Sequence, residues 1–65
     1  MAVPTKLLNR IDEHLTRSEV FKAVVLYREA MGCGISEAKD FIGARFRERF
    51  PELWEQYDNL EGEDS

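Results

Sequence analysis

The side chains that most often carry chemistry are scarce in this chain. Among its 65 residues there is one cysteine, Cys33, and one histidine, His14. One thiol cannot form a disulfide within the chain, and one histidine with one cysteine makes a poor set of metal ligands. Cys33 follows an expected helix C-terminus, where the dipole disfavours a thiolate. We interpret Cys33 as a small apolar turn residue and His14 as a surface residue at the margin of an apolar stripe.

The sequence also lacks the arrangements on which enzymes depend. It has no glycine-rich phosphate loop, no paired-cysteine motif and no nucleophile with a base beside it. A chain this short buries only about 60% of its unfolded surface, which leaves little material for an enclosed catalytic pocket. We therefore expect a protein that is not an enzyme and that uses no metal ion and no cofactor.

Charge is distributed unevenly. The first 50 residues hold all 9 basic residues and 7 of the 13 acidic ones, a net charge of +2, whereas residues 51–65 hold 6 acidic and no basic residues, a net charge of −6. We interpret residues 61–65 as a disordered, solubilising acidic tail. The alternative is an acidic inhibitor or decoy protein that uses this tail together with Glu52, Glu55 and Asp58.

Three arginines, Arg45, Arg47 and Arg49, form the densest basic group. Two helices joined by a short glycine turn also describe a helix-turn-helix reader of DNA. Base-reading residues lie near the start of the second helix, and there this chain has Glu37 and Asp40. Together with the net charge of −4, this disfavours nucleic-acid binding, which we keep as a less favoured alternative.

Apolar residues recur with the spacing of helices rather than strands, which predicts an all-α fold. The expected architecture is one small bundle within residues 1–60, with three helices plus a short C-terminal helix. The expected helices span residues 5–16, 18–31, 36–49 and 51–60. Gly32 can close the second helix in the left-handed conformation, and Pro51 stops the third helix and suits the start of the fourth.

Local signals refine these limits. Thr16 and Glu19 match a capping box, with Ser18 as a competing cap, and Ser36 is expected to cap the third helix. Gly43 lies inside that helix at a cost of about 1 kcal/mol relative to alanine. Close approach of another backbone would explain this glycine, and chance is the alternative.

The second expected helix has apolar residues outside its core stripe. Val25 and Leu26 fall toward the face that carries Lys22 and Glu29. Two interpretations stay open: the helix is covered on two sides, or it exposes an apolar patch for a partner. Self-association through this patch together with Phe21 would give a homodimer.

The chain shows no sign of a membrane segment. Its longest apolar run, residues 23–27, is far shorter than the roughly 20 residues that a bilayer requires. The first residues are not followed by the apolar core of a signal peptide. We expect a cytoplasmic protein that does not bind a membrane.

The stretch from Phe21 to Ile42 resembles the helical hairpin in the C-terminal domain of the bacterial ribosomal stalk protein. It also resembles short bacterial proteins that carry this hairpin behind an N-terminal helix. The shared features are a basic and apolar first helix, a glycine-x-glycine turn, an aliphatic residue, and then Glu-Ala-Lys-Asp. The matching residues are Arg28, Gly32, Gly34, Ile35, Glu37, Ala38, Lys39 and Asp40.

In the stalk family this hairpin is a docking surface that recruits translation GTPases and other factors to the ribosome. The resemblance therefore implies that the hairpin of this chain binds another protein. Arg28 and Lys39 match surface residues of the family, whereas Val25 and Ser36 stand where lysines are common. These departures, with the expected absence of strands, imply a partner that differs from the ribosomal factors.

We accordingly expect non-enzymatic protein binding through the face of the second and third helices. Apolar residues beside basic ones define the candidate contact set. These residues are Val25, Leu26, Arg28, Lys39, Arg45 and Arg49.

Overall fold

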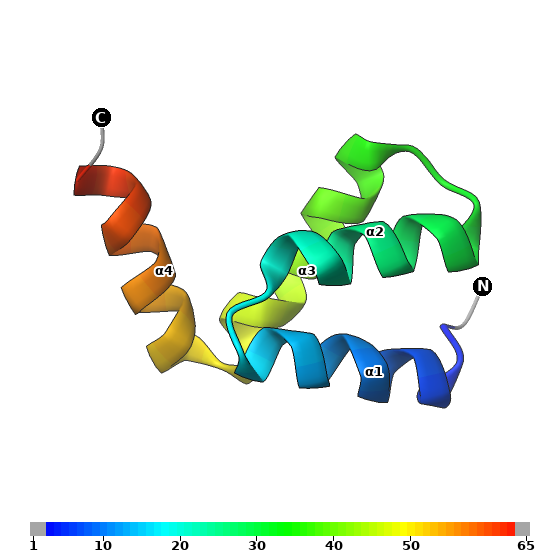
Figure 1. The fold of residues 1–65 in the computed structure, drawn as a ribbon, viewed down its shortest axis with the longest axis horizontal. Coiled ribbons are helices and arrows are strands. Elements are labelled where there is room, and N and C mark those ends of the chain that lie inside the picture. The colour runs from blue at the N-terminus through cyan, green and yellow to red at the C-terminus, as the bar shows by residue number, and fades with distance from the viewer. Residues whose placement is uncertain (1–2, 64–65) are drawn as a thin grey trace.

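The computed structural model describes residues 3–63 of the chain, and the side chains of residues 3–57. Its helices are α1 (Thr5–Thr16), α2 (Val20–Met31), α3 (Ile35–Arg49) and α4 (Pro51–Glu63) (Figure 1). The described residues contain no strand, which confirms the all-α prediction. α2 begins two residues later than predicted, α3 one residue earlier, and α4 ends three residues later. The last two residues of the predicted tail lie outside the described part.

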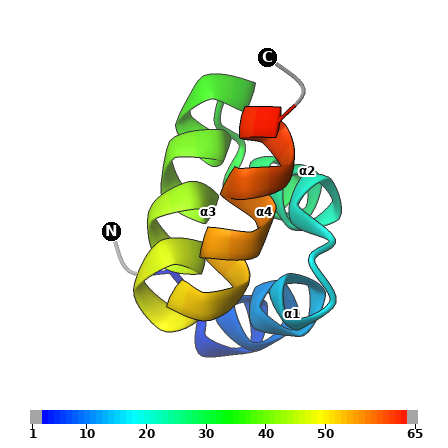
Figure 2. The same ribbon diagram turned by 90° about the vertical axis from the view of Figure 1, so that its left-hand side faces the viewer.

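α2 and α3 form a helical hairpin in which the chain reverses its direction, and the other two helices lie on this hairpin (Figure 1; Figure 2). α1 packs mainly against α2, and α4 packs mainly against α3. The most extensive contacts therefore join helices that follow one another in the sequence. Within residues 3–63, no helix has the length and apolar composition that a membrane span requires.

The core is formed by α1, α2 and α3. Its buried side chains are Leu7, Ile11, Leu15, Ala23, Val24, Ala38, Ile42 and Phe46. Phe46 is fully buried and meets two rings of α4, with centroid distances of 6.0 Å to Trp54 and 5.9 Å to Tyr57 in edge-on arrangements. Such aromatic pairs contribute about 0.5–1.5 kcal/mol each beyond their buried area. These rings pack α4 onto α3.

The hairpin turn has the glycine that the sequence predicted. Gly32 adopts a left-handed φ of 65° and donates its N–H to the Arg28 carbonyl at 2.9 Å. Glycine takes this conformation without the clash that a side chain would cause. α3 then begins at Ile35 after an extended Gly34, and no side chain caps it. The prediction that Ser36 caps α3 is therefore wrong, because this serine already lies inside the first turn.

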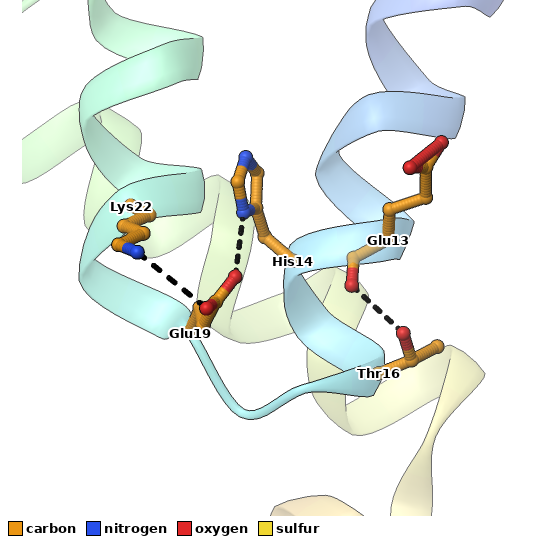
Figure 3. A network of polar contacts seen from close by, with 5 residues as sticks. All are labelled: Glu13, His14, Thr16, Glu19 and Lys22. Atoms are coloured by element: carbon orange, nitrogen blue, oxygen red, sulfur yellow. Dashed lines mark hydrogen bonds and ion pairs between the residues drawn. The ribbon is translucent and has the colours of Figure 1, made fainter.

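The α1–α2 connection also differs from the predicted capping box. No side chain caps α2, whose flanking residue is Glu19. The Thr16 hydroxyl instead donates back to the Glu13 carbonyl at 2.7 Å (Figure 3). Ser18 is not a cap either and takes a left-handed φ of 59°, a conformation that is unfavourable for residues with a side chain. The capping box predicted from Thr16 and Glu19 is therefore not formed.

Instead of capping, the Glu19 carboxylate joins the two helices. It accepts a hydrogen bond from His14 Nδ1 of α1 at 2.9 Å and lies 3.5 Å from Lys22 Nζ of α2 (Figure 3). The hydrogen bond from His14, and then the nearby charge of Lys22, lower the pKa of Glu19 below its ordinary value. His14 is thus the donor of an interhelical contact on the protein surface.

Candidate functional site

Val25 and Leu26 do not lie on one surface. Both side chains are half-buried, but Leu26 packs against the core and Val25 does not. Successive residues of a helix point about 100° apart, so the two side chains diverge. The sequence left open whether α2 is covered at Val25 and Leu26 or exposes them as an apolar patch. Each interpretation therefore holds for one of these two residues. Leu26 serves the covered side of α2, and Val25 remains on the surface.

Val25 belongs to a stripe along the uncovered side of α2 that also contains Phe21 and Arg28. Spacings of four and three residues place these side chains beside one another on a helix. Phe21 is 74% exposed, and Arg28 is exposed as well. No carboxylate among the described side chains forms an ion pair with Arg28. We call Phe21, Val25 and Arg28 the exposed α2 stripe.

Lys39 is the candidate contact residue near the start of α3. It is exposed, and no described carboxylate lies within ion-pair distance of its amine. Lys39 lines a groove together with Val24 of α2, the residue that precedes Val25. Of the six predicted contact residues, Val25 and Arg28 thus share the exposed α2 stripe, and Lys39 lines a groove with Val24 of α2.

Arg45 and Arg49 instead hold α1 and α3 together. Arg45 Nε donates to Asp12 Oδ1 at 2.7 Å, and Arg45 Nη2 donates to Asp12 Oδ2 at 2.9 Å. Arg49 Nε lies 3.3 Å from the same Oδ2. The Arg45 side chain is only 19% exposed, and its hydrogen bonds with Asp12 raise its pKa. A two-point arginine–carboxylate pair is among the stronger polar contacts in proteins. We therefore remove Arg45 and Arg49 from the candidate contact set.

Beside the exposed α2 stripe lies a groove with a volume of about 220 Å³. Three helices contribute its lining side chains, which gives it walls on several sides. We call it the aromatic groove. It is lined by Val20 and Val24 of α2, Lys39 and Gly43 of α3, and Trp54 and Tyr57 of α4.

A larger hollow, of about 320 Å³, lies at the α3–α4 bend. Its lining consists of the consecutive residues 49–53, so it is the concave side of one turn. The aromatic groove brings together residues that are distant in the sequence. It is therefore the better candidate for recognition of another molecule.

The described residues hold no group of three or more histidine, cysteine or acidic side chains placed to bind a metal ion. Cys33 is a free, half-buried thiol in the hairpin turn. Glu52 and Glu55 are exposed on α4. The side chain of Asp58 and those of the acidic tail lie outside the described residues, so the decoy alternative stays a prediction.

Sequence reasoning missed the partner of Arg45 and the aromatic groove. Arg45 was placed in the candidate contact set, but it pairs with Asp12, which lies 33 positions away. No local pattern signals such a contact. Signals for the groove were present: Trp54 and Tyr57 have the spacing of residues that fold back, and Gly43 interrupts α3.

Comparison of the chain with protein-family models, with curated protein sequences and with solved structures finds no match. The likeness of residues 21–42 to the ribosomal stalk hairpin therefore stays a prediction that depends on the residues of this chain alone.

Proposed function

We propose that this chain is a non-enzymatic module that binds an acidic protein partner through the exposed α2 stripe and Lys39. The observation that carries this proposal is the 74% exposure of Phe21 on the stripe that also holds Val25 and Arg28, and Arg28 has no ion-pair partner among the described side chains. A large aromatic side chain left in water forgoes about 1.5–3 kcal/mol of burial energy. Contact with a partner would recover part of this energy.

The composition of the surface fits a protein interface. Aromatic residues and arginine are enriched at interfaces and supply most of the residues whose removal weakens binding strongly. Arg28 and Lys39 give the hairpin two positive charges that no described carboxylate neutralises. Charge complementarity therefore favours an acidic partner.

The ion pairs of α3 weigh against nucleic-acid binding. Two of the three arginines that would contact phosphates, Arg45 and Arg49, are joined to Asp12. Only Arg47 of that group has no described ion-pair partner. Because affinity for nucleic acid grows with the number of phosphates neutralised, one arginine supports little binding.

The test is affinity capture of partners from an extract of the source cells, with the wild-type chain and two variants as bait. Val25→Asp places a negative charge in the exposed α2 stripe and should reduce recovery of the specific partner at least tenfold. Ala44→Asp is the matched control, because Ala44 is an exposed helical residue of α3 outside the stripe and outside the groove lining. It should leave recovery unchanged.

Circular dichroism must show that both variants keep the helical content of the wild type. A folded Val25→Asp variant that recovers the same partner in the same amount would reject this surface. Equal loss of the partner with Ala44→Asp would also reject it, because the effect would then come from charge alone.

A further inference from the structure

The aromatic groove has the chemical character of a slot for one apolar side chain. Val20 and Val24 form its aliphatic wall, and Trp54 and Tyr57 form its aromatic wall. Its volume of about 220 Å³ is several times the roughly 30 Å³ of one water molecule. Among the described lining residues, Lys39 is the charged one. An apolar group that enters here would leave water and lie close to one positive charge.

Gly43 explains why this space exists. A Cβ atom added at Gly43 would meet no other atom within 4 Å, so no neighbouring backbone requires a glycine at this position. Of the two explanations that the sequence left open for Gly43, the close approach of another backbone is therefore excluded for the described residues. Glycine lowers the stability of a helix relative to alanine. What the absent side chain provides here is room in the groove that Gly43 lines.

We propose that the aromatic groove receives a single leucine-sized side chain from an acidic segment of the partner protein, and that Lys39 pairs with a carboxylate of that segment. This inference rests on the proposed function and names the chemistry of the partner. Charge complementarity selects this occupant, because Lys39 in the groove and Arg28 in the neighbouring stripe both lack a described carboxylate partner.

The chain carries its own reporter for this binding. Trp54 is its single tryptophan, and it lines the groove. The probe is a blocked synthetic peptide of glutamate and alanine with one central leucine, titrated into the full chain while Trp54 fluorescence is recorded. The matched peptide has alanine in place of the leucine. We expect the leucine peptide to bind about tenfold more tightly, because it buries additional apolar carbon.

Substitutions in the chain test whether the leucine peptide binds in the aromatic groove. Gly43→Leu fills the groove and should weaken binding of the leucine peptide at least tenfold. Ala44→Leu introduces the same side chain at the next position, on an exposed part of α3 outside the groove lining, and should leave binding unchanged. Lys39→Gln should weaken binding about threefold at low salt, and Lys39→Arg should restore it. Thermal unfolding monitored by circular dichroism verifies that each variant folds.

Three results would overturn the inference. The first is equal binding of the leucine and alanine peptides. The second is unchanged binding by a folded Gly43→Leu variant. The third is a wild-type dimer in sedimentation that Gly43→Leu dissociates and Ala44→Leu does not, because a second copy would then fill the groove. If the peptide fails to bind but partner capture still depends on Val25, the groove assignment falls and the proposed function stands.

Discussion

The two flanks of the α2–α3 hairpin are held by different kinds of contact. On the α1 flank, Ile11 and Leu15 are fully buried. Asp12 of α1 binds two arginines of α3, and His14 binds Glu19, the residue that immediately precedes α2. This flank combines apolar burial with directional polar contacts that cross between helices.

The α4 flank is looser. Its helix rests on Phe46 through Trp54 and Tyr57, both of which are half-buried. Between these rings and α2 the aromatic groove remains, and the exposed α2 stripe lies beside it. No ion pair among the described side chains joins α4 to the rest of the chain.

Under the proposed function, stability and recognition depend on different flanks of one hairpin. A small domain has few buried residues, and a surface that binds a partner must leave some apolar area uncovered. Here the α1 flank stabilises the fold, so the other flank can expose its apolar residues. Substitutions should therefore separate the two properties.

The largest effect is expected from the core of the α1 flank. Leu15→Ala should lower the free energy of unfolding by about 3 kcal/mol, because it removes a fully buried side chain and leaves a cavity. Trp54→Ala removes a larger but half-exposed side chain and should cost less. Urea denaturation of both variants provides the comparison. A larger loss for Trp54→Ala would reverse the assignment of stability to the α1 flank.

The ion-pair cluster should have the next largest effect. Asp12→Ala should lower the free energy of unfolding by about 2 kcal/mol, because it leaves the poorly exposed guanidinium of Arg45 without its acceptor. Arg49→Ala should cost about 0.5 kcal/mol, since Arg49 is 54% exposed and its pair is screened by solvent. Thermal and urea unfolding measure both. Equal losses would show that the Arg45 pair adds nothing to the stability that Asp12 provides.

On the α4 flank we expect a gain in stability. Gly43→Ala should raise the free energy of unfolding by about 1 kcal/mol, because alanine favours the helix and its Cβ meets no neighbour. The reverse change at the next position, Ala44→Gly, should lower it by about the same amount. A loss of stability in Gly43→Ala would mean that the groove is narrower than described.

The smallest effect concerns pH. The folded protein lowers the pKa of Glu19, so the contacts of its carboxylate stabilise the fold above the unfolded pKa near 4.5 and are lost as pH falls through the lower folded pKa. Between about pH 6 and pH 3, the wild type should lose more stability than Glu19→Gln. Denaturation at a series of pH values measures this difference. If the free energy of unfolding of the two proteins changed with pH in parallel, the contact between His14 and the Glu19 carboxylate would add no stability.

The sequence predicted the helices well because their signals are local. Apolar spacing indicated four helical segments, and Gly32 and Pro51 marked two of their limits. The caps at Thr16 and Ser36 were predicted wrongly. Their side chains had the right chemistry, but the tight turns placed them elsewhere, and turn geometry depends on how neighbouring helices pack.

The candidate site was predictable only in part. Periodicity singled out Val25 and Arg28, which share one stripe of α2, and Lys39, which lines the aromatic groove. The same reasoning could not separate Arg45 from them, because the partner of Arg45 is distant in the sequence and no local pattern reveals it. The aromatic groove depends on the position of α4, which is a property of tertiary packing.

Each helix packs mainly against a helix that is next to it in the sequence, and this affects how the chain folds. Because the main contacts join consecutive helices, few long loops must close before native contacts form. Proteins with such local topology fold in microseconds to milliseconds. Each helix emerging from the ribosome can settle on the preceding one, and the pair between Asp12 and Arg45, 33 positions apart, forms only once α3 has been made.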